Sequence, residues 1–342
     1  MVRTYLASTP YHLLLSLALQ ERDGRPDAAL IFSDEARILQ RAPELGVLLG
    51  KTFDVRSVPP LSGSSRILDP ARARRSSVAT LDALRSLGGT ESLWVFNGQT
   101  PPALAAGRHY GDSLRFEYVE DGLDAYLPVN LHQVKPLRRR LHAISFGQSH
   151  PHLIDMTAAL PFSGWHVLFP DFCRLDVGLD RITPIPADAL VNAIGRAATA
   201  VPQSGVPESI TDLHLLGRTT PTHGAHSGIE AMRAWADSVR DRYPGASLAV
   251  KAHPLESDRA TLKALEDVDD LLVLPSWVPS ELLTSLLAPE VRIRCDLTTF
   301  IVTSRVLLPG RTVELESTVA AESARALLEW DPQIYEAEPT GR

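Results

Sequence analysis

The sequence predicts an α/β fold of two Rossmann-like domains that face a central cleft. Short apolar runs alternate with segments of helical periodicity along most of the 342 residues, and this alternation is typical of βαβ units with parallel sheets. Residues 196–211 interrupt the alternation with small residues, proline and glycine, which indicates a linker. We therefore expect an N-terminal domain over residues 1–198 and a C-terminal domain over residues 209–342.

In the first half, the expected strands are separated by helices and followed by a less regular region over residues 127–186. The helices are expected from the spacing of apolar residues. Over residues 72–87, for example, apolar side chains recur every third position from Val78 to Leu87. The expected strands cover residues 4–8, 28–33, 55–58, 92–97 and 114–119, and the expected helices cover residues 11–21, 34–49, 72–87 and 102–110.

After the linker the alternation resumes and continues to a last helix, which is a candidate to pack back on the N-terminal domain. In open α/β sheets ligands bind beyond the carboxyl ends of the strands, so polar residues at strand ends are the candidates for function. The expected strands cover residues 212–216, 247–251, 271–274, 291–295 and 312–316, and the expected helices cover residues 228–243, 257–265, 279–287 and 319–330.

Composition and charge argue against several classes of protein. The formal net charge of −7 does not favour nucleic acid as a partner. Two cysteines are too few for a disulfide framework, which fits a reducing cytoplasm. No apolar stretch approaches the roughly 20 residues of a membrane span, and Tyr11 and His12 interrupt the apolar run near the N-terminus, which disfavours a signal peptide. We expect a cytoplasmic protein.

Several short motifs fail on spacing or context. The stretch 46-GVLLGKT-52 is one residue short of a phosphate-binding loop and lies at an expected helix end. The chain contains neither G-x-G-x-x-G nor G-x-S-x-G. Asp267 and Asp269 have the D-x-D spacing of some metal-dependent sugar transferases, but a solvated turn between a helix and a strand is the better interpretation. No metal site is expected.

Glu120, Asp121 and Gly122 follow directly on an apolar strand. A carboxylate held at a strand end can accept a proton from an attacking hydroxyl group, which makes Asp121 a candidate general base. Its acidic neighbour Glu120 can tune or position it, and Gly122 allows the backbone to turn sharply. The alternative interpretation is an Asx-type turn that leads into a helix.

Two expected strand ends in the second half carry groups that bind phosphate. Lys251, His253 and Pro254 follow one strand, where lysine and histidine can bind or protonate a phosphate oxygen and proline ends the strand. Thr298 and Thr299 follow another, where hydroxyl and N–H groups at a helix start form a phosphate site or simply cap the helix. Together the three motifs indicate an acceptor domain with a base and a nucleotide domain with phosphate binders.

The order of these motifs, E-D-G, then K-x-H-P, then a hydroxyl pair, resembles bacterial sialyltransferases of the GT-B type. This group includes the capsule polysialyltransferases and the lipooligosaccharide sialyltransferases. The stretches 8-STPYHLLLSLAL-19 and 275-PSWVPSELLTSLL-287 are also similar to segments of that group. The resemblance implies a GT-B fold and an inverting, metal-independent glycosyltransferase that moves a nonulosonic acid, such as sialic acid or Kdn, from a CMP-activated donor to a glycan hydroxyl. It implies no further cofactor.

The resemblance also implies roles for individual residues. Asp121 matches the general base, His253 matches the histidine that contacts the CMP phosphate and helps the leaving group depart, and Glu281 matches a glutamate near the ribose. The remaining residues expected in the two sites are Lys251, Pro254, Thr298 and Thr299 for the donor, and Glu120, Gly122, Thr9 and Pro10 for the acceptor or for positioning.

The implied partners are a CMP-nonulosonate donor and an acceptor that is a glycan, a lipid-linked sugar or a small molecule with a free hydroxyl. Synthesis of such a polysaccharide would take place at the inner face of the membrane, where basic residues favour contact with an anionic surface. Solvated helix faces are the alternative interpretation of the basic residues. The two basic clusters are Arg66, Arg72, Arg74 and Arg75, and Lys135, Arg138, Arg139, Arg140 and His142.

Two other functions stay open on the sequence. One is a GT-B transferase or epimerase that uses a UDP- or GDP-sugar, and the other is a non-catalytic protein that binds sugar nucleotides or glycans. Nucleotide preference separates the first from the CMP-dependent reaction, and absence of turnover identifies the second.

Overall fold

The chain forms two compact units in the computed structural model, unit 1 over Met1–Ala193 and unit 2 over Ile194–Arg342. The expected site residue Pro254, the basic residue Arg66, the basic cluster at 135–142 and most of the expected helix at 257–265 lie outside the described residues. The structure describes residues 2–34, 37–60, 70–127, 160–175, 177–201, 210–217, 225–253, 265–266, 268–315 and 321–336.

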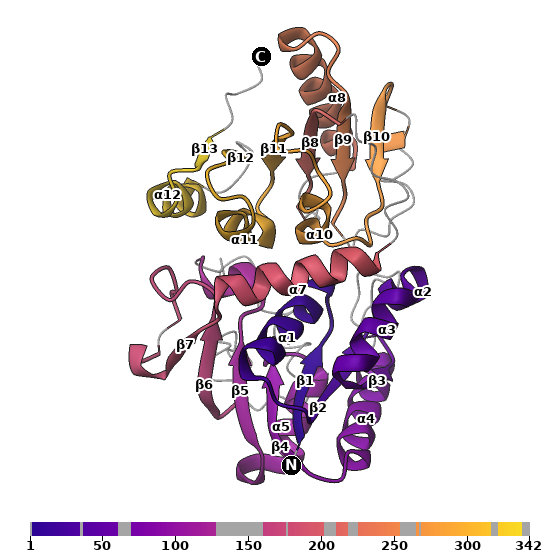
Figure 1. The fold of residues 1–342 in the computed structure, drawn as a ribbon, viewed down its shortest axis with the longest axis vertical. Coiled ribbons are helices and arrows are strands. Elements are labelled where there is room, and N and C mark those ends of the chain that lie inside the picture. The colour runs from indigo at the N-terminus through magenta and orange to yellow at the C-terminus, as the bar shows by residue number, and fades with distance from the viewer. Residues whose placement is uncertain are drawn as a thin grey trace. The chain divides into compact units, whose positions relative to one another are not determined.

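Unit 1 contains a seven-stranded sheet in the order β3-β2-β1-β4-β5-β6-β7, in which every strand is parallel to its neighbours (Figure 1). The strands are β1 (Val2–Ala7), β2 (Ala28–Ser33), β3 (Asp54–Val58), β4 (Thr90–Val95), β5 (Arg115–Val119), β6 (Phe162–Val167) and β7 (Ile182–Pro184). The helices are α1 (Pro10–Asp23), α2 (Ile38–Arg41), α3 (Pro43–Thr52), α4 (Pro70–Ser86), α5 (Pro101–Tyr110) and α7 (Ala187–Ala200), with 3₁₀ turns η1 (Gly111–Ser113), η2 (Gly122–Ala125) and η5 (Leu179–Arg181).

The helices of unit 1 change faces of the sheet between β1 and β4. On one face the strand residues Leu93 and Val95 pack in a core with residues of α4 and α5. On the other face Tyr5 contacts Phe53 at the end of α3, and Phe96 lies against α1. The strand order also reverses between β1 and β4, so their carboxyl ends form a topological switch point, where such sheets bind ligands.

The first helix begins at once after β1 because of its two first residues. Thr9 caps the helix by accepting a hydrogen bond from the backbone N–H of His12 (3.2 Å), and Pro10 supplies the fixed φ angle of a first helical position. Gly24 ends the helix with a φ of 58°, a left-handed conformation that glycine adopts readily. These signals place α1 directly beside the switch point.

One expected helix is two helices in the structure. The sequence pattern predicts a single helix over residues 34–49, whereas α2 ends at Arg41 and α3 begins at Pro43. The residue before a proline is pushed out of the helical region, and Ala42 accordingly has φ −131° and ψ 73°. The prediction of one continuous helix is therefore wrong.

Unit 2 contains a six-stranded parallel sheet in the order β10-β9-β8-β11-β12-β13 (Figure 1). Its order reverses between β8 and β11, so their carboxyl ends form the switch point of this unit. The strands are β8 (Asp212–Leu215), β9 (Leu248–Lys251), β10 (Leu271–Leu274), β11 (Arg292–Cys295), β12 (Val313–Leu315) and β13 (Ile334–Glu336). The helices are α8 (Ala225–Arg242), α10 (Ser280–Thr284), α11 (Thr299–Leu307) and α12 (Ala321–Trp330).

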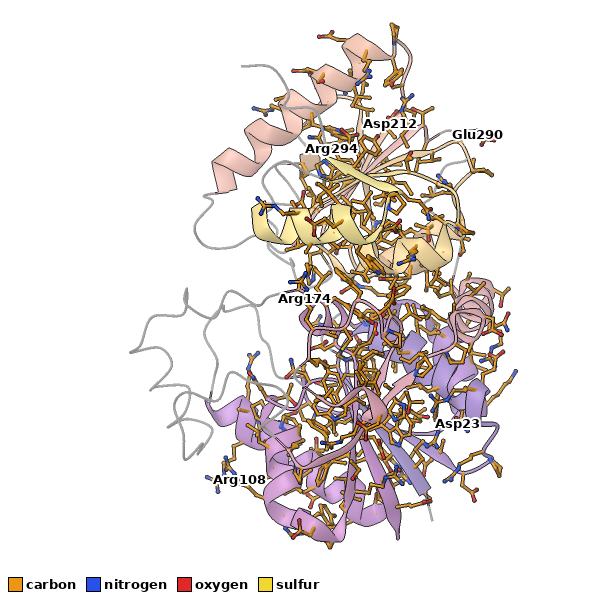
Figure 2. The ribbon with its side chains drawn as sticks, turned by 90° about the vertical axis from the view of Figure 1, so that its left-hand side faces the viewer. Asp23, Arg108, Arg174, Asp212, Glu290 and Arg294 are labelled. Carbon is orange, nitrogen blue, oxygen red and sulfur yellow. The ribbon has the colours of Figure 1, made fainter. Side chains whose placement is uncertain are left out.

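Hydrophobic packing and a charged clamp hold unit 2 together. Trp235 of α8 packs on Leu248 and Val250 of β9 in a buried cluster. At the amino end of the sheet Arg292 donates two hydrogen bonds of 2.6 Å to the carboxylate of Asp212, which is labelled in Figure 2. This bidentate pair ties the beginning of β11 to the beginning of β8.

The expected α/β fold class is confirmed, but some of its elements were not predicted, among them the last strand, β13. Strands β6 and β7 lie in the region expected to be irregular, and α7 occupies the first residues of the expected linker. Phe162–Val167 carries Ser163 and Gly164, which interrupt the apolar pattern of a strand. The division between the two units falls inside α7, after Ala193. Among the described helices, none is both long and apolar enough to cross a membrane.

Candidate functional site

Asp121 is held at the carboxyl edge of unit 1 by side chains from two other elements. His12 of α1 approaches its Oδ1 with Nε2 at 2.5 Å, and Asn97, just after β4, donates from Nδ2 to its Oδ2 over 2.7 Å. The carboxylate side chain is 19% exposed. A carboxylate fixed through both oxygens and open on one side is suited to exchange a proton with a bound substrate.

His12 and Asn97, the two partners of this carboxylate, also line a small pocket at the switch point between β1 and β4. Its polar groups are hydroxyl, imidazole and amide groups, which suit the hydroxyl groups of a sugar. The lining residues are Leu6, Ala7, Ser8, His12, Ser33, Val58, Asn97, Thr100 and Pro102.

Glu120 points into the protein and is 1% exposed. Tyr11 donates a hydrogen bond to its Oε1 (2.6 Å), the backbone N–H of Leu168 donates to its Oε2 (2.6 Å), and Tyr126 also donates to Oε2. Burial raises the pKa of Glu120 to about 7, while these donors act in the opposite direction. Glu120 therefore ties α1, β5 and the end of β6 together beneath Asp121.

The other residues expected in the first site shape the backbone. Gly122 has a φ of +74°, so the turn after Asp121 uses a conformation that disfavours a residue with a side chain. Thr9 and Pro10 start α1 and thereby place His12 one turn later. The sequence analysis assigned no role to His12 or Asn97, although the interruption of an apolar run by His12 was a usable signal.

In unit 2 a second carboxylate, Asp296, is fixed at the switch point between β8 and β11. His214 of β8 approaches Oδ1 with Nε2 at 3.1 Å, and the backbone N–H of Gly217 donates to Oδ2 over 2.9 Å. Burial acts to raise the pKa of Asp296, but the hydrogen bonds from His214 and Gly217 outweigh it and lower the pKa. The sequence analysis named Asp296 only as the first residue of the hydroxyl motif.

Lys251 and Glu281 lie beneath the strand ends of unit 2 and are almost fully buried, at 2% and 4% exposure. Burial lowers the pKa of Lys251 to about 8 and raises the pKa of Glu281, and the attraction between the two opposes both shifts. The ammonium group of Lys251 donates to the carbonyl of Ala252 over 3.1 Å. The structure thus brings together two of the predicted donor-site residues, below the surface of the site.

The hydroxyl pair lies at the start of α11, as the motif predicts. Thr298 is the N-cap residue and Thr299 is the first helical residue. The hydroxyl of Thr298 makes no capping bond and lies 3.1 Å from the Sγ atom of the buried Cys295. His253 follows β9 directly and is partly exposed. Because Thr298 makes no capping bond, the backbone N–H groups at the amino end of α11 have no side-chain cap and suit an anion.

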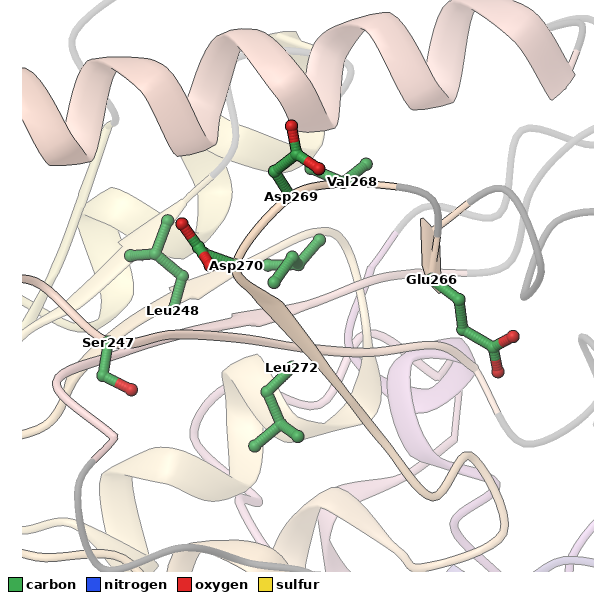
Figure 3. Close-up of a pocket in the computed structure, with 8 residues that line it drawn as sticks. Ser247, Leu248, Glu266, Val268, Asp269, Asp270 and Leu272 are labelled. Carbon is green, nitrogen blue, oxygen red and sulfur yellow. The ribbon is translucent and has the colours of Figure 1, made fainter.

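A hollow in unit 2 lies at the other end of its sheet (Figure 3). Leu248 begins β9 directly after Ser247, and Leu271 and Leu272 begin β10, so this hollow borders the amino ends of the strands. Its acidic residues, among them Asp269 and Asp270, fit the solvated turn expected from the sequence. Ligands of such sheets bind at the carboxyl ends, so this hollow is not the candidate site.

No metal site is evident in the part of the chain that the structure describes, because nowhere there do three His, Cys, Asp or Glu side chains gather. The expectation of chemistry without a metal stays a prediction. The basic residues Arg74 and Arg75 are exposed on α4. Contact of this cluster with a membrane surface also stays a prediction.

The two parallel-sheet units define the class of the protein as a GT-B fold, and similar solved structures cover nearly the whole chain. UDP-GlcNAc 2-epimerase from Methanocaldococcus jannaschii, in complex with UDP-GlcNAc and UDP, is 11% identical, covers 98% of this chain and 89% of its own, and has a TM-score of 0.62. The enzyme from Neisseria meningitidis, bound to UDP-GlcNAc, is 13% identical, covers 96% of this chain and 85% of its own, and has a TM-score of 0.59. The Rickettsia bellii enzyme is 12% identical, covers 94% of this chain and 80% of its own, and has a TM-score of 0.58. No protein-family model and no curated protein matches the chain.

The resemblance to sialyltransferases is wrong. The similar structures include UDP-GlcNAc 2-epimerases, and no family model or curated protein supports a sialyltransferase. The expectations that depended on this resemblance are therefore also wrong. They are a CMP-dependent glycosyltransferase, transfer of a nonulosonic acid, and a CMP-nonulosonate donor as partner. The physical reason is that three short polar motifs mark strand ends in any sheet of this topology, and they do not specify the nucleotide.

Proposed function

We propose that the protein is an enzyme that acts on a UDP-activated sugar, with inversion at carbon 2 of UDP-GlcNAc as the first candidate reaction. The observation that carries the proposal is the doubly held carboxylate of Asp121 near a switch point, in a fold similar over 94–98% of the chain to three structures named as UDP-GlcNAc 2-epimerases. Asp121 is the acid–base group of the proposed site.

The chemistry of inversion at a carbon fits a fixed carboxylate. Inversion at carbon 2 breaks the C2–H bond, whose electron pair forms a double bond between carbons 1 and 2 while UDP leaves carbon 1. UDP then adds back to carbon 1 as carbon 2 takes a proton on the opposite face. A carboxylate within hydrogen-bond reach can accept the proton that leaves carbon 2. In the proposal Asp121 takes this role, and Asn97 and His12 keep it in place.

In the proposal unit 2 binds the nucleotide. The support is the uncapped start of α11, where Thr298 and Thr299 present hydroxyl and backbone N–H groups at the switch point. Lys251, although buried, adds positive charge beneath the same strand ends. These groups suit the phosphates of UDP, and His253 is a further candidate for contact with them.

Transfer of the sugar from UDP to a hydroxyl group is the second candidate. The pocket lined by His12 and Asn97 favours it, because Ser8, Ser33 and Thr100 of the same pocket can bind an acceptor hydroxyl. The two reactions differ in their products, since only inversion at carbon 2 regenerates an intact UDP-sugar.

One experiment separates the alternatives. The protein is incubated with UDP-GlcNAc in D₂O, and the sugar is followed by proton NMR with and without glycan acceptors. The expected result is the carbon-2 epimer with deuterium at carbon 2, together with thermal stabilisation by UDP but not by CMP or GDP. Release of UDP only in the presence of an acceptor would support transfer. If the protein shows no turnover and UDP does not stabilise it, the proposal of an enzyme of this class is refuted.

A further inference from the structure

His12 is buried at the switch point of unit 1 and makes contacts on every side. Its imidazole is 2% exposed and stacks on Phe96, with ring centroids 4.3 Å apart and an interplanar angle of 7°. Nε2 lies 2.5 Å from Oδ1 of Asp121. Nδ1 lies 3.2 Å from the backbone nitrogen of Ser8 and 3.5 Å from its hydroxyl oxygen. The ring therefore has a single orientation.

These contacts determine which ring nitrogen carries the proton. A backbone N–H group can only donate, so Nδ1 must accept the hydrogen bond from Ser8. The neutral ring then carries its proton on Nε2, from which it donates to the carboxylate of Asp121. The same geometry excludes a serine nucleophile of the Ser–His–Asp kind, because the lone pair that would take the serine proton is already engaged.

The two donors leave part of the carboxylate of Asp121 free. Each carboxylate oxygen has two lone pairs, and His12 and Asn97 occupy one on each oxygen. The remaining lone pairs are available to a substrate proton, while the two N–H groups prevent rotation of the carboxylate. His12 contacts Asp121 from the side of α1, and Asn97 from the side of β4.

We propose that His12 is a positioning residue that, as a neutral Nε2–H imidazole, fixes the carboxylate of Asp121 and itself transfers no proton to or from the substrate. The kinetic part of this inference rests on the proposed function, whereas the protonation of the ring does not. A histidine with an acid–base role would need a nitrogen free to face the substrate, and both nitrogens of His12 face the protein.

The first measurement is independent of activity. In the full-length protein labelled with ¹⁵N, the His12 signals are assigned by their loss in H12Q and recorded at neutral pH. The expected pattern is that of the Nε2–H tautomer, with an Nε2 proton that shifts in D121N and a tautomer that persists in S8A because the backbone of Ser8 makes the contact. An Nδ1–H or imidazolium pattern would overturn the inference.

The second measurement is the carbon-2 exchange rate of H12Q and H12A as a function of pH. The amide nitrogen of glutamine can replace Nε2 as a donor, so H12Q should keep kcat within about tenfold and retain the shape of the pH profile. H12A should lose roughly 10²-fold in kcat with little change in KM, because Asp121 is no longer aligned. If kcat of H12Q falls as far as kcat of H12A, and one limb of the pH–rate profile disappears, His12 is itself an acid–base residue. If the wild type has no activity, the proposed function fails, and the NMR result decides the protonation of the ring.

Discussion

At the scale of single residues, the proton acceptor of the proposed reaction is the carboxylate of Asp121. The variant D121N keeps the size of the side chain but places an amide N–H against one of the two N–H donors, His12 or Asn97. We expect the rate of carbon-2 exchange to fall by roughly 10²–10⁴, the usual contribution of a general base. The measurement is kcat by NMR, with the circular dichroism spectrum as a control for folding. Near-normal turnover would exclude Asp121 as the base.

Glu120 gives the protein a stability that depends on pH. Burial raises its pKa from 4.5 to about 7, so the folded protein holds this proton more tightly than the unfolded chain. The free energy of unfolding should therefore fall as the pH rises from about 4.5 to about 7, by on the order of 3 kcal/mol, and stay level above. The variant E120Q cannot titrate and should lack this component.

Urea denaturation at pH 5 and pH 8 measures the effect as the difference between wild type and E120Q. Titrating groups common to both proteins, such as His166, largely cancel in this difference. Burial acts to raise the pKa of Glu117, but hydrogen bonds and charges from His166 and Arg115 outweigh it and lower the pKa, so Glu117 titrates below the window. An equal loss of stability in both proteins over this range would contradict the assignment to Glu120.

The candidate site residues that the sequence indicates lie near strand ends. Asp121 is a candidate because an apolar strand shortly precedes it, and Thr298 is a candidate because a hydroxyl pair opens a helix. His12 is marked in the sequence only as a polar residue inside an apolar run, and its contact with Asp121 forms only when the fold brings the end of β5 beside α1. The hydrogen bond between His214 and Asp296 likewise joins residues 82 positions apart, so the sequence pattern alone does not predict it.

At the scale of elements, the two threonines that begin helices should differ in their contribution to stability. Thr9 accepts a hydrogen bond from the backbone N–H of His12, whereas the hydroxyl of Thr298 lies against Cys295 and makes no cap. T9A should lower the free energy of unfolding by about 1 kcal/mol, and T298A by less. Thermal unfolding of the two variants, with T9S as the matched control, measures the difference. A larger loss in T298A would show that Thr298 stabilises its helix in another way.

The order of most strands and helices could be predicted because each element carries its own pattern. The strands at 28–33 and 271–274 lie where the apolar runs place them. Strand β6 could not be predicted, because Gly164 breaks its apolar pattern for a reason that lies in another strand. A side-chain carbon at Gly164 would come within 2.3 Å of Oε2 of Glu117 in β5, so a larger residue would force that buried carboxylate to move. Helix α7 was hidden by its small residues, which are good helix formers as well as linker residues.

At the scale of the whole molecule, both units place a His–Asp pair at the point where their strand order reverses. His12 and Asp121 occupy this position in unit 1, and His214 and Asp296 occupy it in unit 2. The surroundings differ, because His12 and Asn97, which hold Asp121, also line a small pocket with hydroxyl groups, whereas Asp296 fixes the backbone of Gly217 next to the start of α11. In the proposed function this difference assigns the acid–base step to unit 1 and the nucleotide to unit 2.

Hydrogen exchange of the full chain tests this assignment without any turnover. If UDP binds at the switch point of unit 2, the amides of Gly217 and of residues 296–301 should exchange more slowly in its presence, because a bound ligand suppresses local opening. The strand ends of unit 1 at 97–100 and 120–122 should respond to UDP-GlcNAc but not to UDP alone, because in the proposed function Asp121 acts on the sugar. Protection by UDP confined to the ends of β4 and β5 would reverse the assignment. CMP is the matched control, and equal protection by CMP would show that the site does not distinguish the two nucleotides.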